Sequence, residues 1–561
     1  MIADYLDRDY VLSETRAHRN SLVALQKKVL KKDKKALAAL RQNEITQTQL
    51  AQVIAALNQA LAKASKDKKH PQGSAYLPPD PVTCGLQAGM TRIAMDSGQV
   101  QLNKPAPAKT ATRRRALGKA RRGAAADTSP MLRLRRRAGA PRAKGARAMR
   151  AAFVEGEDAR YALDGFKAKF GALFSSRRNF NKNPARVARS AKPLTLYVFG
   201  DWGTGLSLAG EVTKRIGEQL ADDDGSRQQH VIHLGDFYYV GEAKEYVDRA
   251  FPYWPVKSAQ RDTIGSWSLN GNHDMYSGGG GYFDTLLKKD YMLRWHGDKT
   301  GQPSSFFLIE DNDWQVFGLD TSWNLPSLAG TIFGKPTMKD YGGQNGVLTK
   351  EQATWMAAMR DPGKGCILLT HHQPASSRST EAQHADEAVA LLKSAGVYSQ
   401  IDAWIWGHEH RGVVFKPKAE RTTKRLKDAP NFCACLGHGG VPVTKKNLEA
   451  EHRIADVLWE EDRLGDDAPI YEGQRAVPFG FGRIDTRPGA FDFQIFDHNG
   501  KPRYASVVAR ETTAAPTRGV SRRRIPAAVK AKTKTKGITR RKAKGVKSVS
   551  KKIRQPKSSR T

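Results

Sequence analysis

The sequence predicts a layered α/β domain over residues 191–510, and three observations support this fold class. Short apolar runs typical of buried strands alternate with segments of helical periodicity. Polar motifs follow several of the predicted strands, which is where open α/β sheets place their ligands. The chain of 561 residues is also long enough for one sizeable domain with additional segments.

The strand predictions rest on length and apolar composition. The first group covers 194–199, 230–234, 264–269, 306–309, 316–319, 366–369, 401–406 and 432–436. A second group, 479–484, 491–496 and 503–508, is expected to be antiparallel, with Asn499-Gly500 as a tight turn between its last two strands. Helices are expected where Val212, Ile216 and Leu220 mark one face, and after Thr349.

Residues 10–66 show helical periodicity, since Leu22, Leu25 and Val29 recur at three- and four-residue spacing. Thr46 and Gln49 fit a capping box that begins a second helix. The segment could form a helical hairpin, self-associate as a coiled coil, or dock on the main domain. Residues 70–100 are rich in Pro, Gly and Ser and are predicted to be loop.

The net charge of +37 is concentrated in two segments. Residues 101–150 contain 16 Lys and Arg and one acidic residue, and residues 518–561 contain 18 Lys and Arg and no acidic residue. Such segments bury too little apolar surface to fold, so disorder is expected over 101–150 and 511–561. Three roles stay open for these segments: binding to nucleic acid, with nucleoid association, binding to another polyanion, or service as a soluble linker.

The predicted organisation has four parts. Residues 1–69 form a helical segment, 70–190 a mostly disordered basic linker, 191–510 the α/β domain and 511–561 a disordered basic tail. The sequence contains four cysteines, no recognisable secretory signal and no apolar stretch long enough for a membrane span. A cytoplasmic location is therefore expected.

Five polar motifs occur in order between residues 200 and 410, each behind an apolar run. They are Gly200-Asp201-Trp202-Gly203, Gly235-Asp236-Phe237-Tyr238-Tyr239, Gly271-Asn272-His273-Asp274, Thr370-His371-His372 and Gly407-His408-Glu409-His410. Together they provide enough oxygen and nitrogen donors for two adjacent metal ions. Such a pair can clamp a phosphoryl group and supply hydroxide near neutral pH, so the pattern indicates a hydrolase of phosphate esters.

The order of these motifs resembles that of the calcineurin-like metallophosphoesterases. Within that superfamily the sequence is most similar to the purple acid phosphatases, because Gly203 replaces the usual histidine and Tyr239 stands three residues after Asp236. The resemblance covers about residues 194–510. It implies a four-layer α/β/β/α sandwich that hydrolyses phosphomonoesters by direct attack of a metal-bound hydroxide.

The resemblance also implies a ligand set. The first metal, Fe(III), would be held by Asp201, Asp236, Tyr239 and His410. The second metal, Fe(II), Zn(II) or Mn(II), would be held by Asp236, Asn272, His371 and His408, with Asp236 bridging. Two alternatives stay open, because Tyr239 could be a packed aromatic residue and His372 could replace His371.

Three further residues are predicted to act in catalysis. His273, beside Asn272, is expected to face the substrate and to stabilise the phosphoryl transition state or protonate the leaving oxygen. Asp274 is expected to orient His273 or a ligand. His384, 13 residues after His371, resembles in placement a substrate histidine of the purple acid phosphatases.

Two other functions remain open on the sequence alone. One is a phosphodiesterase or nuclease that its basic tails tether to nucleic acid. The other is a nucleic-acid-binding protein whose phosphoesterase domain has lost its activity, which the complete set of ligand positions disfavours.

Overall fold

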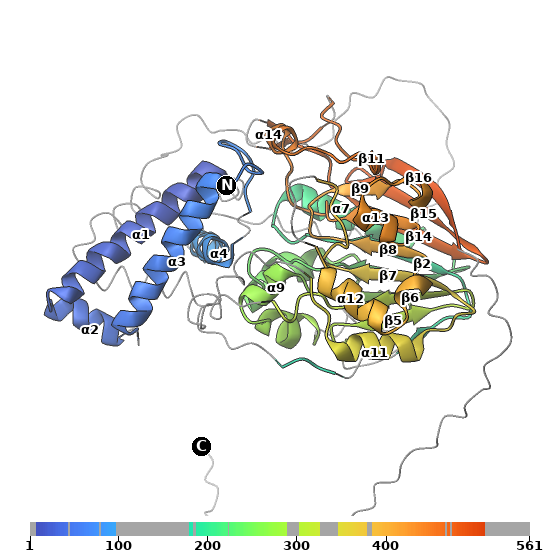
Figure 1. Ribbon diagram of the computed structural model, residues 1–561, viewed down its shortest axis with the longest axis horizontal. Helices are drawn as coiled ribbons and strands as arrows, with labels where there is room; N and C mark the ends of the chain where they lie inside the picture. The colour runs from blue at the N-terminus through green and yellow to red at the C-terminus, as the bar shows by residue number, and fades with distance from the viewer. Residues whose placement is uncertain are drawn as a thin grey trace, which may run out of the picture. The chain divides into compact units, whose positions relative to one another are not determined.

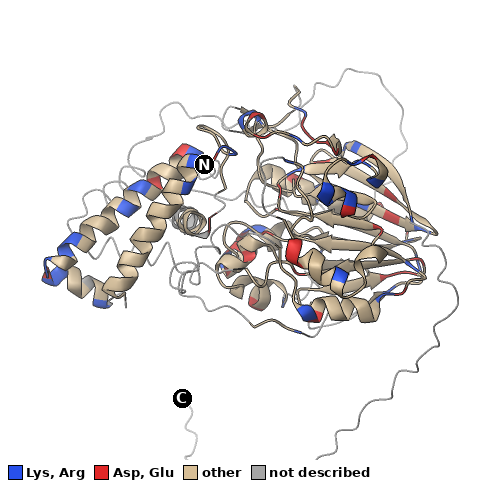
Figure 2. Cartoon of the chain, viewed as in Figure 1, with Lys and Arg blue, Asp and Glu red and all other residues tan. Residues whose placement is uncertain are grey.

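The computed structural model describes residues 7–42, 45–77, 80–96, 179–182, 187–222, 224–288, 302–325, 346–378, 384–465, 468–471 and 474–510. The chain divides into two units, Met1–Glu511 and Thr512–Thr561, and all that follows concerns the first. The predictions of disorder over 101–150 and 511–561 lie outside the described residues. Acidic and basic residues are interspersed over the α/β domain, whereas the charged residues of the helices near the N-terminus are mostly Lys and Arg (Figure 2).

Two β-sheets form the centre of the α/β domain (Figure 1). The eight-stranded sheet has the order β1-β5-β6-β7-β8-β10-β9-β11. Its strands are β1 Ala188–Arg189, β5 Phe307–Glu310, β6 Trp314–Gly318, β7 Gly365–Thr370, β8 Ala403–Trp406, β9 Gly412–Phe415, β10 Phe432–Leu436 and β11 Val457–Glu460.

The six-stranded sheet has the order β16-β15-β14-β2-β3-β4. Its strands are β2 Leu194–Phe199, β3 Gln228–His233, β4 Gly265–Ser268, β14 Gly480–Arg487, β15 Ala490–Asp497 and β16 Pro502–Ala509. In this sheet β2, β3 and β4 are parallel, and in the other sheet β6, β7 and β8 are parallel. The carboxyl ends of parallel strands meet at one edge, so the loops that follow them are brought together.

Four layers result from the packing of side chains on these sheets. Between the sheets lies a buried core to which Val198, Ile232, Leu369, Ile405 and Phe493 contribute. The helices α11 (Lys350–Met359) and α12 (Asp386–Ser394) pack on the outer face of the eight-stranded sheet. The helix α7 (Ser207–Ala221) packs on the outer face of the six-stranded sheet. The predicted α/β/β/α sandwich is therefore confirmed.

All the strands predicted over 194–508 are present, within one or two residues at most ends. The sequence analysis missed β9 and β11. The strand β9 is four residues long and begins two residues after His410. Its apolar run is short and directly follows a polar motif, so its strand signal is weak. The strand β11 has two of its four residues partly or fully exposed, which weakens its apolar signal.

Three helices form the N-terminal segment, α1 Arg8–Leu30, α2 Lys34–Gln42 and α3 Gln47–Lys66. The predicted capping box is present, because the Gln49 N–H donates to Thr46 Oγ1 and the Thr46 N–H to Gln49 Oε1. No described helix combines the length and the hydropathy that a bilayer span needs.

A fourth helix, α4 Pro81–Asp96, lies where the sequence predicted a loop. Pro81 occupies the first helical position, where a missing N–H costs nothing. The Asp80 carboxylate accepts the Thr83 N–H at 2.8 Å and so caps the helix. The loop prediction rested on the proline and glycine content of residues 70–100. Pro81, at the start of α4, and the glycines within α4 are nevertheless accommodated in the helix.

The N-terminal helices dock on the α/β domain. Leu57, Cys84 and Leu86 belong to the same buried cluster as Tyr239 and Tyr276, which follow β3 and β4. One hydrophobic core therefore joins the N-terminal segment to the loops of the predicted metal centre. Self-association through residues 10–66 stays a prediction.

Leu57→Ala tests this shared core. Leu57 is fully buried, so the substitution is expected to lower the free energy of unfolding by about 2–5 kcal/mol. Hydrogen exchange should also become faster at residues 236–240, because they pack on the same core. Leu30→Ala is the matched control, since Leu30 is 70% exposed. Unchanged exchange at residues 236–240 in Leu57→Ala would contradict the docking.

Candidate metal centre

The five polar motifs converge at the carboxyl ends of the parallel strands. Asp201 follows β2, Asp236 follows β3 and Asn272 follows β4, while His371 follows β7 and His408 follows β8. All five of these side chains are buried or nearly so. The two sheets thus contribute donors to one site, as the sequence analysis expected.

The backbone at this site is unusual. Asp201, Asp236, His408 and His410 adopt positive φ angles of 56°, 65°, 71° and 54°. Among the described residues, Lys32 is the only other non-glycine residue with a positive φ. Such angles are costly for side chains with a Cβ and cluster at functional sites. The turns aim these four side chains into the site at an energetic cost that the surrounding fold offsets.

Close approach of the loops also requires glycine at one position. A Cβ atom at Gly271 would collide with the carboxylate of Asp236. The Gly271 N–H meanwhile donates to Asp274 Oδ2 at 2.7 Å. Glycine therefore lets the loop after β4 reach the loop after β3.

A tyrosine hydroxyl lies at the centre of the first group of donors, and it belongs to Tyr238. Its oxygen is 3.1 Å from Asp201 Oδ1, 3.3 Å from Asp236 Oδ2 and 2.7 Å from His410 Nε2. The His410 Nε2 is in turn 3.5 Å from Asp201 Oδ1. Two carboxylates, a phenol and an imidazole thus face one another.

The predicted tyrosine, Tyr239, does not occupy this position. Its ring packs under the guanidinium of Arg249, 4.9 Å from the ring centroid, and its N–H donates to Glu245. Phe237 packs into the aromatic cluster with Trp202 and Tyr246, so the next residue, Tyr238, turns towards the carboxylates. Residue spacing selected Tyr239, whereas in this structure the hydroxyl of the preceding residue, Tyr238, lies among the carboxylates.

The second group of donors surrounds the Nε2 atom of His371. This nitrogen is 3.3 Å from Asp236 Oδ2, 3.1 Å from Asn272 Oδ1 and 3.2 Å from His408 Nδ1. The other ring nitrogen, Nδ1, lies 3.0 Å from the Leu234 carbonyl oxygen and can donate to it. In the neutral ring that tautomer leaves Nε2 with a lone pair for a metal ion.

His372, the alternative to His371, faces a different loop. Its Nδ1 lies 3.0 Å from Thr321 Oγ1, and its ring centroid is 4.6 Å from that of His408. Ring nitrogens of His371, His372 and His408 nevertheless lie within 4.8 Å of one another. His372 lies beside His408 and stays an alternative ligand.

The electrostatics of the site favour a bound cation. Burial, reinforced by the charge of Asp236, raises the pKa of Asp201 well above its ordinary value. Burial also raises the pKa of Asp236, but the charges of His371 and His273 outweigh it and hold that pKa below its usual range. Burial lowers the pKa of His371, yet Asp236 raises it to about 9. Two buried carboxylates so close together need a positive partner.

The donor set fits two metal ions. Carboxylate and phenol oxygens around Tyr238 are hard donors that suit an ion of high charge. Amide oxygen and imidazole nitrogens around His371 suit a divalent ion. Asp236 Oδ2 lies against both groups, so Asp236 is the residue that could bridge them.

His273 lies beside the site, held by the backbone of the neighbouring loop. Its Nδ1 is 2.7 Å from the Tyr239 carbonyl oxygen and 3.4 Å from Cys84 Sγ. Its Nε2 is 3.9 Å from Asp236 Oδ2, so this nitrogen faces the donors. The contact with Cys84 comes from α4 and was not expected from the sequence.

Asp274 organises the loops that carry the ligands. Its Oδ2 accepts the Asp236 N–H at 2.9 Å, and its Oδ1 accepts the hydroxyl of Tyr246. Burial and the charge of Asp236 raise the pKa of Asp274 to about 7. His384 is half-buried and precedes α12 by two residues, and its role as a substrate contact stays a prediction.

Asp320 fixes the loop that holds His372. Its carboxylate accepts the N–H groups of Ser322 and Trp323 at 2.8 and 2.9 Å, next to Thr321. Burial is the largest cause that raises the pKa of Asp320 to about 6. The folded protein therefore binds a proton at Asp320 more tightly than the unfolded chain does.

This shift predicts a pH dependence of stability. The Asp320 contribution is fully present below pH 4 and is lost as the pH rises through 6, because the folded pKa exceeds the unfolded one. Relative to Asp320→Asn, the wild type should lose about 2 kcal/mol between pH 4 and 7, at 1.36 kcal/mol per pKa unit. Denaturation by urea across this range checks the difference, and a difference that is constant or grows with pH would contradict it.

The tyrosine assignment is tested by a matched pair of variants. Tyr238→Phe removes the hydroxyl between Asp201 and His410. Metal affinity at the first position should fall by at least about 10–100-fold, because even the loss of a residue that only supports a ligand has an effect of that size. Tyr239→Phe should bind metal as the wild type does. Elemental analysis and metal titration of both variants measure this. Greater metal loss in Tyr239→Phe would restore the register predicted from the sequence.

Comparison with known proteins agrees with this geometry. Residues 194–412 match the family model of calcineurin-like phosphoesterases. No curated protein matches the sequence significantly.

Similar folds occur among solved structures. The anchor in the inner membrane complex of Plasmodium is 12% identical, with a TM-score of 0.39 over 58% of this chain and 90% of that one. A purple acid phosphatase from yellow lupin seeds is 13% identical, with a TM-score of 0.38 over 58% and 56% of the two chains. A dimetal phosphatase from Danio rerio is 11% identical, with a TM-score of 0.33 over 58% and 100%. The family match spans all five motifs, so residues 194–412 resemble a calcineurin-like phosphoesterase domain.

Proposed function

We propose that this chain is a phosphomonoesterase of the purple acid phosphatase type, with two metal ions that share Asp236. The observation that carries the proposal is the position of the Tyr238 hydroxyl, 2.7 Å from His410 Nε2 and 3.1 Å from Asp201 Oδ1. A phenol among carboxylates and imidazole is a donor set for a ferric ion. The amide and imidazole donors next to it suit Fe(II), Zn(II) or Mn(II).

The proposal assigns each donor to one of two ions. Asp201, Asp236, Tyr238 and His410 would hold the first ion, and Asp236, Asn272, His371 and His408 the second. When bound, such a pair polarises phosphoryl oxygens and lowers the pKa of water, so that hydroxide is available near neutral pH. The remaining contributions come from residues of the chain.

His273 is the proposed proton donor to the leaving oxygen. The Tyr239 carbonyl oxygen, 2.7 Å from Nδ1, fixes the ring so that Nε2 faces the site 3.9 Å from Asp236. A group at this position can hold a proton beside the departing alcohol. Asp274 supports the arrangement, because its carboxylate accepts the N–H of Asp236 and keeps the loops in register.

The basic tails favour a second candidate, a phosphodiesterase or nuclease that acts on nucleic acid. Residues 518–561 carry 18 Lys and Arg with no acidic residue, a composition that binds duplex nucleic acid through its phosphates and independently of base sequence. Under either candidate the same centre performs the hydrolysis. The tails, by this proposal, determine where in the cell the enzyme acts.

Hydrolysis of p-nitrophenyl phosphate and bis(p-nitrophenyl) phosphate by the full chain tests the proposal. The monoester should be turned over with the higher kcat/KM. Asn272→Ala should lose at least about 1,000-fold in kcat. The substitution removes a ligand of the second ion, so that ion no longer positions the phosphoryl group. Asp224→Ala, a change of an exposed surface carboxylate, is the control and should keep the wild-type rate.

Three outcomes would contradict the proposal. Wild-type turnover by Asn272→Ala with an unchanged metal content would remove Asn272 from the centre. A preference for the diester would favour the second candidate. A purified chain that binds no metal and hydrolyses neither ester would exclude both.

A further inference from the structure

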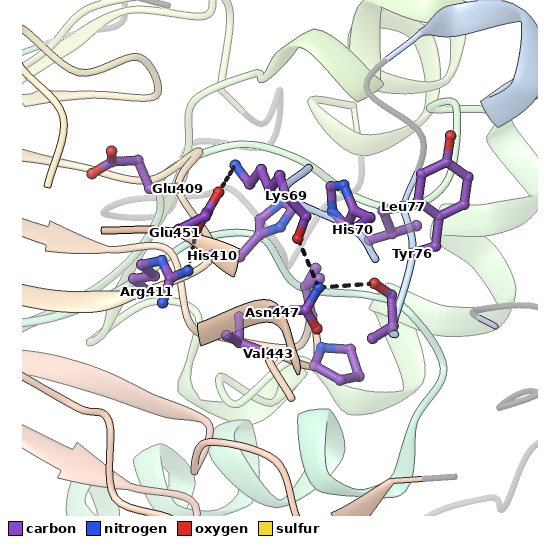
Figure 3. A pocket seen from close by; sticks show the side chains of 13 residues that line it. Lys69, His70, Tyr76, Leu77, Glu409, His410, Arg411, Val443, Asn447 and Glu451 are labelled. Atoms are coloured by element: carbon purple, nitrogen blue, oxygen red, sulfur yellow. Dashed lines mark hydrogen bonds and ion pairs between the residues drawn. The ribbon is translucent and has the colours of Figure 1, made fainter. Parts of the chain in front are cut away.

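A pocket beside the proposed centre is lined on one side by residues of the N-terminal segment and otherwise by residues of the α/β domain (Figure 3). Lys69, His70 and Tyr76 form one wall, and His410, Val443 and Glu451 form the other. We call residues 67–77, between α3 and α4, the strap. The strap thus faces His410, which is a proposed ligand of the first metal ion.

The strap is held in place by its backbone carbonyl oxygens. Asn447 Nδ2 donates to the carbonyl oxygens of Lys69 and Ala75, each at 3.3 Å. Lys446 Nζ donates to the Gln72 carbonyl oxygen at 3.0 Å. Asn447 and Lys446 belong to α14, Lys445–Ala450. Because these contacts use the main chain, the strap is positioned whichever side chain stands at residue 69.

Lys69 extends along this wall past His410 towards Glu451 (Figure 3). Its ammonium nitrogen is 3.7 Å from Glu451 Oε1, which is longer than the ~2.7–2.9 Å of a charge-assisted hydrogen bond. Glu451 also accepts from Arg411. The Lys69 side chain is 35% exposed, long and flexible, so its ammonium group can reach an anion beside His410.

Lys69 and the proposed metal ligand His410 line the same pocket (Figure 3). The Lys69 ammonium group would repel a metal cation at His410. An anion bound between the ammonium group and the metal is attracted by both, and clamps of this kind are how enzymes bind phosphoryl groups.

We propose that Lys69, supplied by the N-terminal strap, contacts the phosphate that binds at the centre and completes its anion-binding site. The inference rests on the proposed function, since it needs the metal centre beside it. It gives the docked N-terminal segment a role in substrate binding. The metal centre alone, by this proposal, binds phosphate less tightly than the complete chain does.

Binding of inorganic phosphate to the metal-loaded full chain tests the inference by calorimetry. Lys69→Met should weaken phosphate affinity by about 10-fold or more, the loss typical of one charge-assisted contact, with the metal content unchanged. Lys69→Arg should stay within a few-fold of the wild type, because it keeps the positive charge. In hydrolysis of p-nitrophenyl phosphate, Lys69→Met should lose a similar factor in kcat/KM.

Lys446→Met is the matched control. It removes the same charge and one contact to the strap, but Lys446 is an exposed residue whose ammonium group bonds to the outer backbone of the strap. Phosphate affinity should therefore change little.

The inference is overturned if Lys69→Met binds phosphate as the wild type does. It is likewise overturned if Lys446→Met weakens phosphate binding as much as Lys69→Met does, because the loss would then come from the position of the strap. It is also overturned if Lys69→Met loses metal. If instead the wild type binds no metal, the proposed function itself fails.

Discussion

Two buried carboxylates, Asp201 and Asp236, impose the main constraint on this structure. Both are almost fully excluded from solvent, and a single phenol oxygen of Tyr238 contacts both. Two negative charges cannot be kept together in such a place without positive partners. Positive φ angles at both aspartates and at His408 and His410 show that the fold accepts backbone strain to keep the group together.

The two sheets and the N-terminal helices all serve this group of donors. The six-stranded sheet supplies Asp201, Asp236 and Asn272 from the ends of three parallel strands, and the eight-stranded sheet supplies the histidines. The core that α3 and α4 share with Tyr239 and Tyr276 supports the same loops from outside. The N-terminal segment is therefore part of the architecture of the site, and loss of packing there affects the loops that carry the ligands.

The sequence was sufficient for a layered α/β domain and for the order of the motifs, because strand composition and glycine-led turns are local signals. The four-layer arrangement was implied by the family resemblance. Sequence reasoning selected Tyr239 by spacing, whereas Tyr238 faces the carboxylates in the structure, where Phe237 packs against Trp202 and Tyr246. It also missed α4 and the strap. Their positions depend on contacts such as that of Asn447 with the strap carbonyl oxygens, which join residues more than 370 positions apart.

Anomalous diffraction from crystals of the full chain, grown after loading with iron and manganese, tests the central claim most directly. The account predicts two peaks about 3.5–4 Å apart, the separation of ions in two-metal hydrolases, with Asp236 between them and Tyr238 at the peak nearer His410. A single peak, or peaks that Asp236 does not contact, would contradict the shared carboxylate on which the proposed chemistry depends.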